Sequence, residues 1–511
     1  ARLSRAVTRM FNTHEEPVLA IPGQIIAGEF QGRLLPDFKV LWDDASTATS
    51  RWAAEHATRF LAARIAVGTI DQAMLAGLQL KHAHLRGAAL SRALLVVDEV
   101  HASDAWMTHI QKAVLDMHLA LGGRVLLMSA TLGSTARALW TETALPDPAM
   151  AENIPYPAIW IGRDLQEVST DGPQKHVQMQ AHVGWSGKQT AELALKAARQ
   201  GARVLVIRNT VDRARETWEA CFHASPDLVM TLRDRPCLHH SRFAAEDRAL
   251  LDGRIEQVLG RDAPQRGIIC IGTQTLEQSL DISADILITD LCPVDVLLQR
   301  IGRLHRHAGA AHPVGFEYPR AIVLAPDQGL APLIRRAENG LGVYEDGSSL
   351  SGVYLDVCGL QATLDQVNTN DVWSIPAMNR MLVEAATHPA NLDAIGEREG
   401  WQMHRARVSG KTYAEGLAAR NVVLDRTRPL APFPDEEAIR TRLGAEGLLV
   451  TFPHGTIGPF GTVIRRMAFP AHWSHGLDPE TLQLDCCEGG LRLTLSGKSF
   501  FYDHSGLRKD G

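Results

Sequence analysis

Two adjacent carboxylates stand directly after an apolar run in the segment LLVVDEVH. Asp98 and Glu99 end this run, and His101 stands three residues after Asp98. At the end of a strand, one such carboxylate can hold Mg²⁺ and the next can orient an attacking water molecule. We therefore expect Asp98 to bind the metal ion, with Asp98, Glu99 and His101 in the catalytic set of a phosphoryl-transfer site. Two solvated acids after a buried strand would give the same local pattern, so the neighbouring motifs decide the interpretation.

A tripeptide with two hydroxyl groups, Ser129-Ala130-Thr131, follows the next apolar run. Hydroxyl groups both donate and accept hydrogen bonds, so they can exchange partners as a cleft closes around a ligand. We expect Ser129 and Thr131 to contact a bound nucleotide. The tripeptide alone is common in loops, and its order after DEVH is what gives it this meaning.

The most specific segment of the chain is QRIGRLHRH, residues 299–307. Its guanidinium groups suit planar contacts with phosphate oxygens. We expect Gln299, Arg303 and Arg306 to be catalytic, with Arg303 and Arg306 as arginine fingers that contribute about 10³ to 10⁵ in rate. Arg300 should contact the nucleotide near its terminal phosphate. A basic helix end is otherwise usually a solvated face that compensates the helix dipole.

Two further segments place hydroxyl and amide groups at strand ends. VGTIDQ contains Gly68 and Thr69, and TQTLEQSLD contains Thr273, Gln274 and Asp281. Such groups can hold a single nucleic-acid strand by its phosphates. We assign this role to Gly68, Thr69, Thr273 and Gln274. Asp281 is expected at the nucleotide. A polar loop with a helix cap would have the same composition.

These residues need parallel strands to bring them to one edge of a sheet. Short apolar runs alternate with amphipathic stretches, which predicts an α/β fold with parallel sheets covered by helices. Polar groups after the carboxyl ends of such strands line the ligand-binding crevice. The expected strands are 92–97, 124–128, 203–207, 267–271, 285–289 and 321–324, with helices at 103–121 and 294–303.

The length of 511 residues with 45% apolar content predicts about three domains. A Pro-rich, acidic stretch at 144–157 interrupts the first alternation, which places a boundary between residues 165 and 185. We predict a first lobe at 1–170, a second lobe at 171–328 and a C-terminal accessory domain at 329–511.

Composition narrows the class of protein further. No run of about 18 uncharged apolar residues and no secretory signal occurs, so we expect a cytoplasmic protein without a membrane span. Seven cysteines without a CxxC pair indicate neither a disulfide framework nor a zinc ribbon. The formal charge of −6 argues against coating DNA by bulk electrostatics, but it permits a local basic cleft.

Taken in order, seven segments resemble the motif series of the superfamily 2 DExH helicase-nuclease of type I CRISPR systems. They are VGTIDQAM, VVDEVH, MSATL, LVIRNTV, HHSRF, TQTLEQSLDI and QRIGRLHRH. The resemblance implies two RecA-like lobes and a C-terminal domain. It also implies ATP and Mg²⁺ at a site between the lobes, and movement on the single-stranded DNA displaced by a guide-RNA surveillance complex in a prokaryote. Arg242 of HHSRF would contact that DNA.

Two departures from the family pattern qualify this expectation. The phosphate-binding loop GxxxxGK[ST] does not precede DEVH, and the segments at 186–188 and 496–499 are interpreted as turns. The chain also has no His-Asp dipeptide for a nuclease. We therefore expect an N-terminally truncated fragment with little or no ATP hydrolysis. Two alternatives stay open: a generic DExH helicase of RNA or DNA, and a nucleic-acid clamp that needs no nucleotide.

Overall fold

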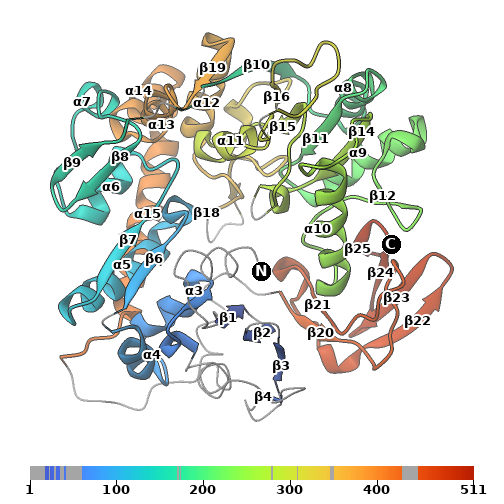
Figure 1. The fold of residues 1–511 in the computed structure, drawn as a ribbon, viewed down its shortest axis with the longest axis horizontal. Coiled ribbons are helices and arrows are strands. Elements are labelled where there is room, and N and C mark those ends of the chain that lie inside the picture. Colours follow the sequence, from blue (N-terminus) through green and yellow to red (C-terminus); the bar gives the residue numbers. More distant parts are fainter. Residues whose placement is uncertain are drawn as a thin grey trace. The chain divides into compact units, whose positions relative to one another are not determined.

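The chain forms two compact units in the computed structural model (Figure 1). The structure describes residues 18–21, 24–27, 30–34, 40–41, 60–91, 93–169, 172, 174–277, 280–307, 309–345, 350–427 and 447–510. Unit 1 comprises Ala1–Ala130 and Ser409–Ala445, and unit 2 comprises Thr131–Val408 and Glu446–Gly511. Residues 131–170, which the sequence placed with the first lobe, thus group with unit 2. The division into three domains stays a prediction.

Unit 1 contains the parallel strand pair that carries the acidic motif. Strands β6 (Leu94–Val97) and β7 (Arg124–Leu127) pair in parallel and are joined through helix α5 (Ala105–Ala120). Asp104 caps α5 by accepting a hydrogen bond from the Met107 amide. Ser103, where the predicted helix 103–121 begins, lies one residue earlier, and its hydroxyl accepts a hydrogen bond from Gln111 instead.

The rest of unit 1 comes from both of its chain segments. A five-stranded sheet has the order β4-β3-β2-β1-β5, in which β1 and β5 are parallel. Its strands are Val18–Ile21 (β1), Gln24–Ala27 (β2), Phe30–Leu34 (β3), Val40–Leu41 (β4) and Ala66–Gly68 (β5). The short helices are α3 (Ile70–Met74) and α4 (Ala83–Leu90). Helix α15 (Gln402–Val422) begins in unit 2 and ends in unit 1, where the Leu424 amide donates to the Gly77 carbonyl at 2.8 Å.

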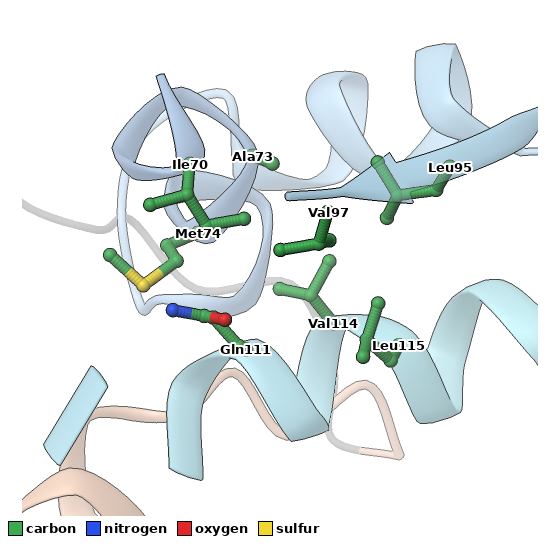
Figure 2. A pocket seen from close by; sticks show the side chains of 8 residues that line it. All are labelled: Ile70, Ala73, Met74, Leu95, Val97, Gln111, Val114 and Leu115. Carbon is green, nitrogen blue, oxygen red and sulfur yellow. The ribbon is translucent and has the colours of Figure 1, made fainter. Parts of the chain in front are cut away.

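A small cavity lies beneath the acidic motif, between α3, β6 and α5 (Figure 2). Its lining is apolar apart from Gln111 and includes Val97, the residue before Asp98. Such a lining cannot bind phosphate, because a buried charge needs polar partners. The cavity therefore belongs to the core that supports the motif.

Unit 2 is built on a six-stranded sheet with the order β14-β11-β15-β16-β10-β19. The first five strands are parallel, and β19 is an antiparallel edge strand. The strands are Ile268–Gly272 (β14), Arg203–Ile207 (β11), Ile286–Asp290 (β15), Arg320–Ala325 (β16), Lys175–Val183 (β10) and Val372–Ile375 (β19). Central strands β11, β14 and β15 are buried throughout, as expected of a parallel sheet covered on both faces. The predicted α/β class with a parallel sheet is confirmed.

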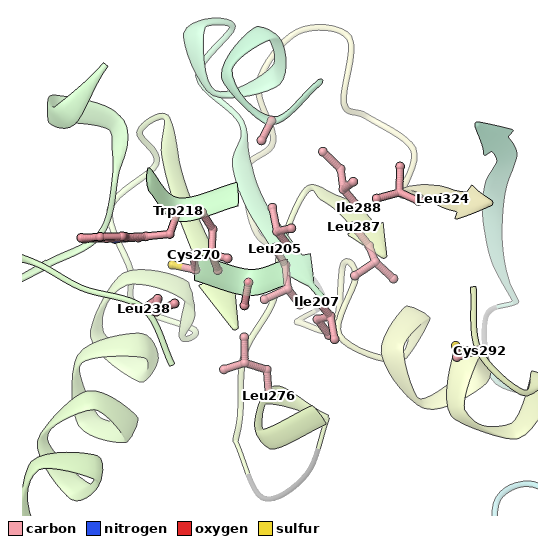
Figure 3. Close-up of a cluster of buried hydrophobic side chains, with 14 of the residues drawn as sticks. Leu205, Ile207, Trp218, Leu238, Cys270, Leu276, Leu287, Ile288, Cys292 and Leu324 are labelled. Carbon is pink, nitrogen blue, oxygen red and sulfur yellow. The ribbon is translucent and has the colours of Figure 1, made fainter. Parts of the chain in front are cut away.

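Helices pack around this sheet and complete the main core (Figure 1; Figure 3). They are α8 (Gly187–Arg199), α9 (Val211–Ala224), α10 (Ala245–Leu259), α11 (Val294–Ile301), α12 (Val357–Thr369), α13 (Asn379–Thr387) and α14 (Pro389–Glu399). Figure 3 shows Leu205, Leu287 and Trp218 in the buried apolar cluster. Ser186 forms a capping box with Gln189 at the start of α8, so the segment at 186–188 begins a helix and is not a free turn. Helix α11 ends at Ile301, two residues earlier than predicted.

Shorter elements surround the sheet of unit 2. They are α6 (Ser134–Thr141), α7 (Pro148–Glu152), β8 (Ala158–Ile161), β9 (Asp164–Glu167), β12 (Thr231–Leu232), β13 (Arg235–Pro236), β17 (Tyr344–Glu345), β18 (Leu350–Ser351), β20 (Leu449–Thr451) and β21 (Arg466–Ala468). A C-terminal antiparallel sheet follows with β22 (Gln483–Cys487), β23 (Gly490–Leu495), β24 (Lys498–Asp503) and β25 (Gly506–Lys509). The predicted turn at 496–499 is confirmed at Ser496 and Gly497, whose φ angles are positive. Across the described ranges, each helix is too short or too polar to cross a lipid bilayer.

Candidate nucleotide and nucleic-acid sites

The two carboxylates of the acidic motif point away from the core after β6. Glu99 has a φ angle of +54°, a left-handed conformation that is uncommon for residues other than Gly, and its amide donates to Asp98 Oδ1 at 2.9 Å. The sharp turn leaves both side chains exposed, and that of Glu99 is 51% accessible. Exposed carboxylate oxygens are the ligands that Mg²⁺ prefers, so Asp98 and Glu99 fit the predicted metal and water-orienting roles.

His101 connects the acidic motif to the hydroxyl tripeptide. Its Nδ1 lies 2.8 Å from Ser129 Oγ and 3.4 Å from Glu99 Oε2, and its side chain is buried. The Val100 amide also donates to the Met128 carbonyl at 3.1 Å. Unit 1 therefore brings together three predicted site residues, Glu99, His101 and Ser129.

Thr131, the other hydroxyl of the tripeptide, is buried and is the first residue of unit 2. The division between the units falls after Ala130. A shared contact of Ser129 and Thr131 with one nucleotide stays a prediction.

Gly68 and Thr69 lie at the end of β5 and the start of α3. The Thr69 carbonyl accepts a hydrogen bond from the Gln72 amide at 3.1 Å, which closes the first turn of the helix. Its buried hydroxyl has no hydrogen-bond partner within the described part of the chain. This group could bond to a phosphate if the segment opened towards solvent.

Arg300 is fully buried and is held by the protein on every side. Its guanidinium donates to Glu277 at 2.8 Å, to Thr289 at 2.5 Å and to Asn209 at 3.2 Å. Burial raises the pKa of Glu277, although Arg300 opposes this effect. In this structure the guanidinium offers no surface to a ligand, so its arrangement suits positioning of the Glu277 loop. The direct nucleotide contact stays a prediction.

Arg303 bridges the two ends of a segment that lies outside the described residues, 278–279. It donates to the carbonyls of Glu277 and Leu280, the latter at 2.8 Å. The motif residues Gln278 and Ser279 fall in that gap. In this structure Arg303 therefore holds Glu277 and Leu280, while Gln299 lies half-buried on α11.

Arg306 is the more accessible of the two predicted arginine fingers. Its side chain is 44% exposed and pairs with Asp281 at 3.1 Å. Lys175 of β10 lies in the same region and donates to the Leu304 carbonyl at 2.7 Å. Burial, together with the charges of Arg306 and Arg303, lowers the pKa of Lys175 to about 8. This concentration of positive charge suits an anionic ligand, and Asp281 partly neutralises it.

The position of Lys175 near the arginine motif could not be predicted from the sequence. Lys175 lies about 130 residues before that motif and belongs to no known sequence motif. The parallel sheet brings the two segments together. A search for isolated cations at strand starts would return many surface lysines.

Thr273 and Gln274 follow β14, and hydrogen bonds to backbone carbonyl groups hold both residues in place. The Thr273 amide donates to the His239 carbonyl at 3.1 Å, and the Gln274 amide group donates to the Asn209 carbonyl at 2.9 Å. His239 also contacts the hydroxyl of Thr275 at 2.7 Å. The loop is thus held at a defined position after the strand, as a phosphate contact would require.

Arg242 lies between an acid and an aromatic ring. It donates to Asp212 at 2.9 Å, and its guanidinium carbon lies 4.5 Å from the ring centre of Trp473. Burial lowers the pKa of Arg242, and Asp212 opposes this effect. Lys509 Nζ lies 5.5 Å from the same ring. Trp473 and Lys509 therefore lie beside Arg242, although no pattern in the sequence indicated them.

One group of side chains in the described ranges has the composition of a metal site. Ligand atoms of Asp285, His305 and His312 lie within 4.8 Å of one another. However, Arg203 pairs with Asp285 at 3.1 Å, and His312 bonds to the same oxygen at 2.7 Å. Burial lowers the pKa of His305 to about 4, with His312 adding to the effect. The carboxylate is already neutralised, so we interpret the group as a brace and assign no metal to it.

Comparison with known proteins points to one family. Residues 200–309 match the family model described as CRISPR-associated nuclease/helicase Cas3, C-terminal. The CRISPR-associated endonuclease/helicase Cas3 of Escherichia coli K12 is 34% identical over 298 residues, which are 56% of this chain and 33% of that protein. The chain thus spans about a third of the length of that relative.

Two solved structures share the fold. A crystal structure of T. fusca Cas3 with ATP matches with a TM-score of 0.72 and 22% identity, over 99% of this chain and 64% of that chain. A chain of a CRISPR RNA-guided surveillance complex in a pre-nicking state matches with a TM-score of 0.65 and 23% identity, over 88% of this chain and 61% of that chain.

The fold defines the class as a mixed α/β protein with a parallel sheet. The sequence matches make the assignment specific. The chain is a homologue of the CRISPR-associated Cas3 nuclease/helicase family, and its fold matches the helicase portion. The resemblance inferred from the motif series is confirmed.

Proposed function

We propose that this chain is the helicase portion of an ATP-dependent DNA translocase in type I CRISPR interference, with two RecA-like lobes and a C-terminal accessory domain. The observation that carries the proposal is the contact of His101 with both Glu99 and Ser129. This contact joins a candidate hydrolytic carboxylate to the next motif in the series, which a pair of merely solvated acids would not need.

In this proposal the predicted site residues act on one magnesium-bound ATP. Asp98 would hold Mg²⁺, which neutralises phosphate charge when bound, and Glu99 would orient the attacking water. Arg306 would stabilise charge that develops on the transferred phosphoryl group. Arg303 and Arg300 would act by fixing the loop that Glu277 begins. The ATP-bound Cas3 relative supports the choice of nucleotide.

Single-stranded DNA would be the polymer that moves. Thr273 and Gln274 in unit 2, and Gly68 and Thr69 in unit 1, would contact its phosphates, and Arg242 would extend the contact towards Trp473. The related chain in a surveillance complex supports a guide-RNA complex as the partner that presents this strand. These groups would contact the backbone and not base edges, so the proposed binding is independent of sequence.

The test is ATP hydrolysis with and without single-stranded DNA, measured on this chain and on the full-length gene product. Glu99→Gln should lower the DNA-stimulated rate by about 10² to 10⁴ through loss of the group that orients water. Asp116→Asn, which changes an exposed acid on α5, is the matched control and should leave the rate unchanged. Equal activity of Glu99→Gln and a wild type that shows DNA-stimulated hydrolysis would refute the proposed role.

Two alternatives have different signatures in the same experiments. A generic DExH helicase of RNA would respond to RNA in place of DNA. A nucleotide-independent clamp would bind nucleic acid but not an ATP analogue, so magnesium-dependent binding of the analogue would exclude it.

A further inference from the structure

Helix α6 begins three residues after the tripeptide Ser129-Ala130-Thr131, and a distant carboxylate holds its first residue. Glu384 Oε1 accepts from the Ser134 amide at 2.7 Å, and Glu384 Oε2 accepts from the Ser134 hydroxyl at 2.6 Å. Both side chains are fully buried. Gly133 has no side chain to cap α6, so Glu384 of α13, 250 positions along the chain, takes the place of the cap.

The same face of α13 holds the two residues before Ser134. Arg380 donates to the Leu132 carbonyl at 2.9 Å and lies 3.3 Å from Glu384 Oε1. Gly133 packs so closely that a Cβ there would lie 2.7 Å from the Thr387 hydroxyl. Residues 132–134 are therefore fixed to α13 at three successive positions, two of them through charged groups.

The other end of this segment is fixed to the acidic motif. Ser129 contacts His101 at 2.8 Å, and His101 reaches Glu99 at 3.4 Å. Two residues, Ala130 and Thr131, separate this anchor from the one on α13. Because so short a link has little slack, a change of hydrogen bonding at Ser129 must shift either the link or the helix that receives it.

We propose that Glu384 is a positioning residue that makes α13 the receiver of changes at the acidic motif, and thereby couples ATP hydrolysis to strand separation. This inference rests on the proposed function. Glu384 contacts neither nucleotide nor DNA in it. It acts through Ser134, and its loss should affect the work obtained from each ATP more than the rate of hydrolysis.

The test uses the full-length gene product and measures DNA-stimulated ATP hydrolysis and base pairs separated on the same samples. Glu384→Gln and Ser134→Ala should each lower the number of base pairs separated per ATP by about tenfold, the scale expected when one link of a coupling path is removed. The hydrolysis rate should stay within about twofold of wild type. The double variant should be no worse than the worse single variant, because Ser134→Ala removes the hydroxyl that donates to Glu384 and Glu384→Gln replaces the carboxylate that accepts from it.

Glu397→Gln, an exposed acid on neighbouring α14, is the matched control and should leave both measurements unchanged. Amide hydrogen exchange of the wild type provides a measurement that needs no variant. Binding of an ATP analogue should change protection at the start of α6 and in α13 together. Unchanged exchange at either place overturns the inference.

Two results with the variants also overturn it. One is an unchanged ratio of base pairs to ATP, and the other is a proportional loss of both activities with a lower unfolding temperature, which indicates a purely structural contact. A wild type without DNA-stimulated hydrolysis removes the proposed function and this inference with it. An active wild type with an unaffected ratio removes this inference alone.

Discussion

Replacing Arg300 by Met should destabilise unit 2 by about 3–5 kcal/mol, because it leaves a buried carboxylate without its partner. Glu277 Oε1 lies 2.6 Å from Arg300 Nη2, and 7% of the Glu277 side chain is accessible. The substitution also removes donors to Thr289 and Asn209. Guanidinium unfolding followed by tryptophan fluorescence measures the loss.

The effect should depend on pH in a defined direction. Burial already raises the pKa of Glu277, and loss of Arg300 raises it further. The folded state then binds a proton more readily than the unfolded chain, so the loss is largest at high pH and shrinks as the pH falls through the raised pKa of Glu277. Unfolding measured at about pH 8 and about pH 5.5 should show this difference.

The double variant Arg300→Met with Glu277→Gln is the matched control. It removes the stranded charge while keeping a similar volume, so it should recover a large part of the lost stability. A decrease of less than about 1 kcal/mol in the free energy of unfolding of Arg300→Met at high pH would refute the reasoning. The pair of Arg300 with Glu277 would then contribute no more than a solvent-exposed ion pair. A double variant as unstable as the single one would show that the stranded carboxylate is not the cause.

Three further predictions concern other charged groups. Burial raises the pKa of Asp247 to about 6, so the stability of unit 2 should rise as the pH falls from about 6 towards 4. Asp247→Asn should remove this pH dependence and stabilise unit 2 by about 1–3 kcal/mol at high pH. An unchanged dependence of stability on pH in this variant would contradict the prediction. Arg306→Ala should lower the rate of ATP hydrolysis by about 10³ without loss of thermal stability. Arg303→Ala should lower both the rate of hydrolysis and the unfolding temperature. Equal unfolding temperatures of the two variants would refute this distinction. Arg242→Ala should weaken the binding of single-stranded DNA. The slope of log binding constant against log salt concentration should fall by the contribution of about one phosphate contact. An unchanged slope would mean that Arg242 contacts only Trp473 and the protein, and not DNA.

Four of the five parallel strands of unit 2, namely β11, β14, β15 and β16, could be located from the sequence to within one residue, whereas β10 was not predicted. Their apolar runs stop at polar residues, as at Arg208 directly after β11 and at Asp290, the last residue of β15. The acidic motif was located from the apolar run that precedes it, since Asp98 follows β6 directly. Local composition carries this information because a strand buried on both faces tolerates few polar side chains.

Burial of individual arginines could not be predicted. Arg300 and Arg306 belong to the same nine-residue motif, QRIGRLHRH, yet Arg300 is buried and Arg306 is exposed. The difference depends on Glu277 and Thr289, which other elements bring against α11. The contact of Glu384 with Ser134 is a further example, because nothing local to either residue indicates a partner 250 positions away.

The discontinuous course of unit 1 has a consequence for its synthesis. Gln79 donates to the carbonyls of Asn421 and Val423, and Leu78 and Leu424 share a buried apolar cluster. About 280 residues of unit 2 lie between the two segments, and at ribosomal rates of about 5–20 residues per second they delay the second segment by roughly 15–55 s. During that interval the nascent first segment must keep apolar surface uncovered, so chaperone engagement should concentrate there until the end of α15 has been synthesised.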